Sequence, residues 1–119
     1  MKKILIVEDE LIPAKLLKTI LTRSNFEVVN ISKNAEDAIN SAKEKNPELI
    51  LMDIRLQGDM DGIEAMHIIR QFSDVPVIYL TGNSDFQTKK RADETNSSGY
   101  FTKPYDNNEL LKAVKEILK

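Results

Sequence analysis

Short runs of apolar residues recur along the chain, separated by longer stretches with helical spacing. The runs are rich in Ile, Val, Leu and aromatic residues and too short for buried helices, so each predicts a β-strand. They comprise Ile4–Val7, Val28–Ile31, Leu49–Met52, Val77–Leu80 and Tyr100–Phe101. Between them, apolar residues recur every three or four positions, as in Leu17, Ile20 and Leu21. This alternation predicts an α/β domain: one parallel sheet with helices on both faces.

Residues with known preferences at helix ends agree with these intervals. Pro13 suits a first helical turn, where its missing N–H has no partner to lose. Asp106 and Glu109 have the spacing of a capping box at the start of the last helix. Asp59 and Asp61 predict a turn and a cap before the third helix, with Gly62 near its start.

The fourth helical interval, from Ser84 to Gly99, differs from the others. It has almost no apolar stripe beyond Phe86 and Ala92. One interpretation is a solvated helix held weakly against the sheet. The other is a movable or partner-binding element, because segments of low stability are where switching motions occur.

Composition narrows the class of protein. The 119 residues suit one domain, 1–119, and the net charge of −2 gives no basic field for nucleic acid. Cysteine is absent, which excludes disulfides and thiolate sites and fits a reducing compartment. The apolar run at Ile4–Val7 is too short for a signal peptide or a membrane span. We therefore expect a cytoplasmic protein with no membrane contact.

Polar side chains follow four of the five predicted strands at the point where each ends. Glu8 and Asp9 follow the first, Asp53 the third, Thr81 the fourth and Lys103 the fifth. Because the carboxyl ends of parallel strands meet at one edge of a sheet, these groups are expected to converge.

Three carboxylates at one edge need a cation, since two charges ~4 Å apart repel by roughly 4 kcal/mol at an effective dielectric near 20. Oxygen ligands without cysteine favour Mg²⁺ over zinc, with Mn²⁺ as the alternative ion. An ammonium group and a hydroxyl suit phosphoryl oxygens. A carboxylate can itself accept a phosphoryl group, and Asp53 ends the most apolar strand, which fixes it best.

Four motifs together resemble the receiver domain of two-component response regulators. They are the Glu8-Asp9 pair after KILIV, LMDIRLQGDMDGIEA around Asp53, LTG at 80–82 and YFTKPY at 100–105. The resemblance covers essentially the whole chain. It implies a flavodoxin-like doubly wound sheet of five parallel strands, in the order 2-1-3-4-5.

The resemblance also implies roles for individual residues. Asp53 is the implied phosphoacceptor, and Thr81 and Lys103 contact the phosphoryl group. Asp9, Asp53 and the backbone carbonyl of Arg55 bind Mg²⁺, and Glu8 reaches it through water. Tyr100 is the aromatic residue whose rotamer follows the switch through Thr81, and the Lys103–Pro104 peptide bond is cis.

The function implied is a phosphorylation-dependent switch rather than an enzyme acting on other molecules. The donor is the phosphohistidine of a sensor histidine kinase or phosphotransfer protein. Phosphorylation is expected to change the surface of the fourth helix, fifth strand and fifth helix, toward a downstream effector or output domain. The partner kinase, the output, a homodimeric state and the phosphoryl lifetime are left open. Arg55 and Asn83 are candidates for tuning that lifetime.

Two other functions fit part of the sequence. A Toprim-like Mg²⁺ nuclease or topoisomerase fragment would use Glu8 with Asp59 and Asp61, but leaves Thr81 and Lys103 unexplained. A degenerate receiver could serve as a docking module only, which the intact acid, hydroxyl and lysine set disfavours. His67 is expected at the surface, and the basic run 89–91 is expected to be solvated. The chain is either a free-standing receiver, which Met1 favours, or the receiver segment of a longer regulator or hybrid kinase.

Overall fold

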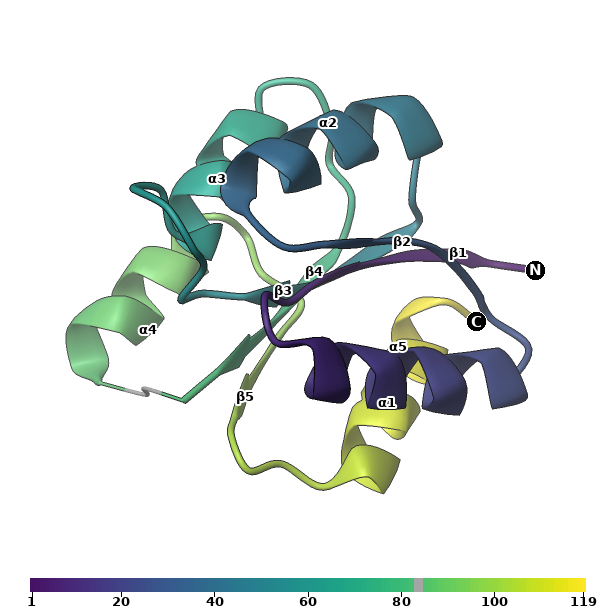
Figure 1. The fold of residues 1–119 in the computed structure, drawn as a ribbon. Coiled ribbons are helices and arrows are strands. Elements are labelled where there is room, and N and C mark those ends of the chain that lie inside the picture. The colour runs from purple at the N-terminus through teal and green to yellow at the C-terminus, as the bar shows by residue number, and fades with distance from the viewer. Residues whose placement is uncertain (83–84) are drawn as a thin grey trace.

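A computed structural model describes residues 1–82 and 85–119 as a five-stranded parallel sheet between two layers of helices (Figure 1). The strand order is β2-β1-β3-β4-β5, so the predicted flavodoxin-like topology is confirmed. The strands are β1 (Lys3–Val7), β2 (Glu27–Ser32), β3 (Leu49–Asp53), β4 (Val77–Thr81) and β5 (Gly99–Thr102). The helices are α1 (Leu11–Arg23), α2 (Ala35–Lys45), α3 (Gly62–Ile69), α4 (Phe86–Asp93) and α5 (Asn107–Ile117).

The core has two apolar clusters, one on each face of the sheet. Along β3, Ile50 and Met52 pack into the cluster under α2 and α3, whereas Leu49 and Leu51 pack into the cluster under α1 and α5. Successive strand residues point to opposite faces, so a strand covered on both sides is apolar at every position. This is why LILM is a continuous apolar run.

The observed strands extend past their apolar runs. The ladder between β3 and β4 continues to Asp53, which pairs with Leu80, and the ladder between β4 and β5 continues to Thr81. Backbone hydrogen bonds do not depend on side-chain polarity, so apolar patterning alone placed these boundaries a residue short. The extension puts Asp53 and Thr81 on the last rungs of the sheet.

Aspartates are the N-cap residues of α3, α4 and α5. The capping box predicted for α5 is only partly formed. Asp106 caps α5 by accepting hydrogen bonds from the N–H groups of Asn108 and Glu109, at 2.7 and 3.2 Å. Within the described residues, however, the reciprocal capping box lies at α3, between Asp61 and Glu64. Pro13 lies in the first turn of α1, as predicted.

Helix α4 is weakly packed, as its sequence predicts. Among its eight residues Ala92 is buried, whereas Phe86 at its start is 80% exposed. His67 is exposed on α3, as expected. Across the described residues, no helix is both long enough and apolar enough to span a bilayer.

Candidate functional site

The carboxyl ends of β1, β3, β4 and β5 surround a crevice of about 280 Å³. Its lining consists of Asp9, Glu10, Asp53, Arg55, Thr81, Gly82 and Lys103. Glu8 joins this group through an ion pair with Lys103. The structure therefore brings together, at one edge of the sheet, the five side chains that the sequence placed at strand ends.

Lys103 lines the crevice and contacts two carboxylates. Its Nζ is 2.9 Å from Glu8 Oε1 and 2.9 Å from Asp53 Oδ2. Its backbone N–H donates to the carbonyl of Thr81 at 2.7 Å, and the Lys103–Pro104 peptide bond is cis. Burial by itself lowers the pKa of Lys103, but hydrogen bonds and charges from Asp53 and Glu8 outweigh it and raise that pKa well above its usual range.

The two carboxylate oxygens of Asp53 contact different neighbours. Asp53 is 5% exposed, and Oδ1 accepts a hydrogen bond from the Arg55 N–H at 3.3 Å while Oδ2 faces Lys103. Burying a carboxylate is costly unless it is paired, and Lys103 supplies the pairing cation for Asp53.

The acidic residues after β1 form a tight group. The carboxylate oxygens of Glu8, Asp9 and Glu10 lie within 4.8 Å of one another, and Glu8 Oε2 accepts the Glu10 N–H at 3.1 Å. Burial raises the pKa of Asp9, and the hydrogen bond and charge of Glu8 raise it further. Such a set of hard oxygen donors suits Mg²⁺.

Glu10 is a member of this group that sequence reasoning did not select. The signal was present, because Glu10 continues the acidic run EDE that follows β1. Asp53 lines the same crevice but lies outside the group of three acids.

Thr81 and Tyr100 lie on neighbouring strands. Thr81 is buried at the end of β4, and Tyr100 is half-buried on β5. The Tyr100 ring centroid lies 6.4 Å from that of Tyr79 and 5.3 Å from the Lys89 ammonium group. The Tyr100 ring therefore lies on the face of the sheet that α4 covers, in contact with Lys89 of that helix. Asn83, a candidate for tuning the phosphoryl lifetime, lies outside the described residues.

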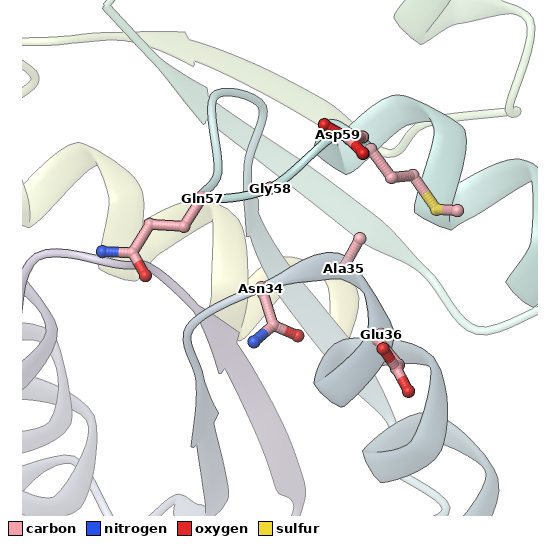
Figure 2. Close-up of a pocket in the computed structure, with 7 residues that line it drawn as sticks. Asn34, Ala35, Glu36, Gln57, Gly58 and Asp59 are labelled. Atoms are coloured by element: carbon pink, nitrogen blue, oxygen red, sulfur yellow. The ribbon is translucent and has the colours of Figure 1, made fainter.

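A separate hollow of about 400 Å³ lies between the start of α2 and the loop that follows β3. Figure 2 shows Asn34, Ala35 and Glu36 on one side of it, and Gln57, Gly58 and Asp59 on the other. Asp59 therefore lies away from Glu8, which is paired with Lys103, and Asp61 caps α3. The acid set that a Toprim-like nuclease needs is not assembled.

The fold and the crevice define a doubly wound α/β domain with a lysine-bridged acidic site at the carboxyl edge of its sheet. Within that class, the chain belongs to the response regulator receiver domain family, whose model matches residues 4–115. It is therefore a regulatory domain of the two-component type, consistent with a phosphorylation-dependent switch.

Relatives from several bacteria support this assignment. The transcriptional regulatory protein YvrH of Bacillus subtilis (strain 168) is 33% identical over 116 residues, which cover 98% of this chain and 48% of YvrH. A two-component response regulator from Clostridium difficile superposes with a TM-score of 0.93 at 28% identity, covering 99% of this chain and 96% of that one. The signal receiver domain of a modulated diguanylate cyclase from Desulfovibrio desulfuricans G20 gives 0.90 at 30% identity, with 99% and 94% covered.

These relatives are named for different functions. The chain spans about half the length of the curated relatives it matches. YvrH is named a transcriptional regulatory protein, whereas the structure from Desulfovibrio desulfuricans G20 is the signal receiver domain of a modulated diguanylate cyclase.

Proposed function

We propose that the chain accepts a phosphoryl group on Asp53 from a phosphohistidine of a sensor histidine kinase or phosphotransfer protein. The observation that carries the proposal is the position of Lys103, whose Nζ lies 2.9 Å from both Glu8 and Asp53 at the carboxyl edge of the sheet. A buried carboxylate beside a fixed cation is suited to act as a nucleophile toward an anionic phosphoryl group.

The transfer forms one bond and breaks another. A carboxylate oxygen of Asp53 attacks phosphorus, and the P–N bond of the donor breaks with its electron pair returning to the imidazole. Lys103, which already contacts Asp53, would balance the negative charge that arrives, and the Thr81 hydroxyl would donate to a phosphoryl oxygen. Most of the acceleration comes from positioning and charge stabilisation, as in other phosphoryl transfers.

Mg²⁺, or Mn²⁺ in its place, fits the oxygen donors of the crevice. Asp9, Asp53 and the Arg55 carbonyl would hold the ion directly and Glu8 through water, with Glu10 as a further donor. A bound divalent ion would supply positive charge against the phosphoryl oxygens.

The resulting aspartyl phosphate acts as a regulatory signal and leaves no other substrate changed. Thr81 moves toward the phosphoryl group, Tyr100 takes the space that Thr81 leaves, and the surface of α4, β5 and α5 shifts between two populations. We infer a single receiver domain over residues 1–119 that works in the cytoplasm. Its readout is an effector or an output domain, with no direct nucleic-acid contact.

Incubation with acetyl phosphate and Mg²⁺, followed by intact mass measurement, tests the proposal. The wild type should gain one phosphoryl group, and the gain should disappear with Asp53→Ala or when Mg²⁺ is chelated. Asp59→Ala is the matched control, because Asp59 is exposed and lies outside the crevice. A wild type left unmodified by several small phosphodonors, or an adduct that persists in Asp53→Ala, contradicts the proposal.

A further inference from the structure

The start of α3 is packed directly against the backbone of Asp53. A Cβ on Gly62, the first residue of α3, would lie 2.1 Å from the Asp53 carbonyl oxygen and 2.9 Å from Met52 Cγ. The Gly62 N–H donates to the Ile54 carbonyl at 2.7 Å. With no free space at this contact, a shift of the Asp53 backbone must be followed by the first turn of α3.

Asp61 extends this contact outward, because both of its carboxylate oxygens are used. Asp61 Oδ1 accepts a hydrogen bond from the Glu64 N–H at 2.8 Å. In return, the Asp61 N–H donates to Glu64 Oε1 at 2.9 Å. Oδ2 accepts a hydrogen bond from Arg91 at 2.9 Å. The capping box fixes Asp61 to α3, so the Arg91 ion pair ties α4 to α3.

Besides Arg91, helix α4 contacts the sheet through Lys89, whose Nζ lies 5.3 Å from the centroid of the Tyr100 ring on β5. Ala92 is its one buried residue, and the Lys89–Asp93 ion pair lies within the helix itself. Beyond its C-terminal end, Thr95 is anchored by a hydrogen bond of 2.7 Å with the Tyr79 hydroxyl. Arg91 therefore supplies a specific polar tie between the body of α4 and the rest of the domain.

The ion pair also borders a cavity of about 200 Å³ beside the phosphorylation crevice. Its lining consists of Ile54, Arg55, Asp61, Thr81, Thr88 and Arg91. Two of these residues, Arg55 and Thr81, line the crevice as well. The Arg91–Asp61 ion pair therefore lies next to the crevice that contains Asp53, between that crevice and α4.

We propose that the Arg91–Asp61 ion pair is a latch that holds α4 in its unphosphorylated position and couples it to Asp53 through α3. This route runs through Gly62 and Asp61, and is separate from the one through Thr81 and Tyr100. The inference rests on the proposed function, since it concerns how phosphorylation of Asp53 is transmitted.

Coupling between two sites is reciprocal, so a latch that favours the unphosphorylated arrangement opposes occupancy of the phosphoryl site. Breaking it should loosen α4 and tighten the binding of a phosphoryl mimic. Simple charge effects predict a different pattern: loss of a cation at Arg91 weakens anion binding, and loss of an anion at Asp61 strengthens it. The two explanations differ in sign at Arg91.

The experiment compares the wild type with Arg91→Gln, Asp61→Asn and the double variant. Asparagine is a good N-cap residue, so Asp61→Asn removes the charge and keeps the start of α3. Lys90→Gln is the control for loss of one positive charge on the same helix, because Lys90 is exposed. The readouts are amide hydrogen exchange of α4 and the affinity for beryllofluoride in the presence of Mg²⁺.

We expect Arg91→Gln and Asp61→Asn each to raise α4 exchange and to tighten beryllofluoride binding by about two- to fivefold, the range of a partly exposed ion pair. The double variant should show no more than either single change, and Lys90→Gln should leave α4 exchange unchanged. Weaker binding by Arg91→Gln, or α4 exchange equal to that of Lys90→Gln, overturns the latch. A wild type that binds no beryllofluoride instead contradicts the proposed function, so the two failures are distinguishable.

Discussion

Asp53 is tolerated at the end of an apolar strand because its charge is shared. Lys103 bridges Asp53 and Glu8, both about 5% exposed or less, so one cation balances two buried carboxylates in part. Removing either partner of a buried pair leaves an uncompensated charge, which is why all three residues depend on one another. The remaining negative charge makes the crevice attractive to a divalent cation.

Gly62 should be intolerant of any side chain. In Gly62→Ala the added methyl would overlap the Asp53 carbonyl oxygen, so the free energy of unfolding should fall by about 3 kcal/mol. Gly82→Ala is the matched comparison for stability, because a Cβ there meets nothing within 4 Å. Urea denaturation of both variants measures the difference, and equal stabilities would mean that the packing of α3 on β3 is looser than described.

Tyr79 should make the stability fall at alkaline pH. Burial raises the pKa of its hydroxyl from 10.0 to about 12, partly offset by the hydrogen bond to Thr95. Above pH ~10 the unfolded chain loses this proton while the folded chain keeps it, so stability is lost as pH rises through this window. Relative to Tyr79→Phe, the wild type should lose about 2 kcal/mol of unfolding free energy between pH 10 and 12.

At neutral pH, Tyr79→Phe also differs from the wild type in its free energy of unfolding. There the variant should be less stable by about 1 kcal/mol, because it lacks one hydrogen bond, while Thr95 keeps its bond to the Ala92 carbonyl. Denaturation at a series of pH values measures both effects. Parallel pH profiles for the two proteins would show that Tyr79 is not shielded from water.

The positions of single residues were predictable from sequence where they depend on strand ends. Asp53, Thr81 and Lys103 follow apolar runs, and the convergence of parallel strands brings them together. Contacts between different helices were not predictable in the same way. The Arg91–Asp61 pair depends on where α4 lies over α3, and a polar helix carries no apolar pattern that fixes its rotation.

At the scale of elements, α3 and α4 have the same length and opposite packing. Each has eight residues, but α3 buries five of them, including Ile63, Met66 and Ile69, whereas α4 buries Ala92 alone. Tertiary packing supplies most of a helix's stability in proteins, so α4 is poised to move at small energetic expense. The sequence predicted this contrast, because the hydrophobic pattern of the fourth interval is nearly absent.

Amide exchange should therefore separate the two helices. In the unmodified protein, α4 amides should exchange at least about tenfold faster than α3 amides, equivalent to roughly 1.4 kcal/mol of local stability. Hydrogen–deuterium exchange with peptide-level mass spectrometry measures this within one sample, so each helix is the control for the other. Equal protection would contradict α4 as the weakly held element.

In the molecule as a whole, apolar clusters pack on both faces of the sheet, and the acidic side chains of Glu8, Asp9 and Asp53 lie together at its carboxyl edge. Mg²⁺ should bind the folded chain and so stabilise it: at ten times its dissociation constant, a ligand adds about 1.4 kcal/mol. Asp9→Asn should abolish this gain, and Asp59→Asn, outside the crevice, should preserve it. Thermal unfolding with and without Mg²⁺ tests this, and a gain that survives Asp9→Asn would place the ion elsewhere.

The central claim, that Asp53 is the phosphoacceptor, can be tested at the level of the single residue. Phosphorylated chain is reduced with borohydride, which converts an aspartyl phosphate into homoserine, and the peptides are then sequenced by mass spectrometry. Homoserine is expected at position 53, with unchanged aspartate at positions 9, 59 and 61. Homoserine at another position, or a phosphoryl group retained on a serine, threonine or histidine, would contradict the claim.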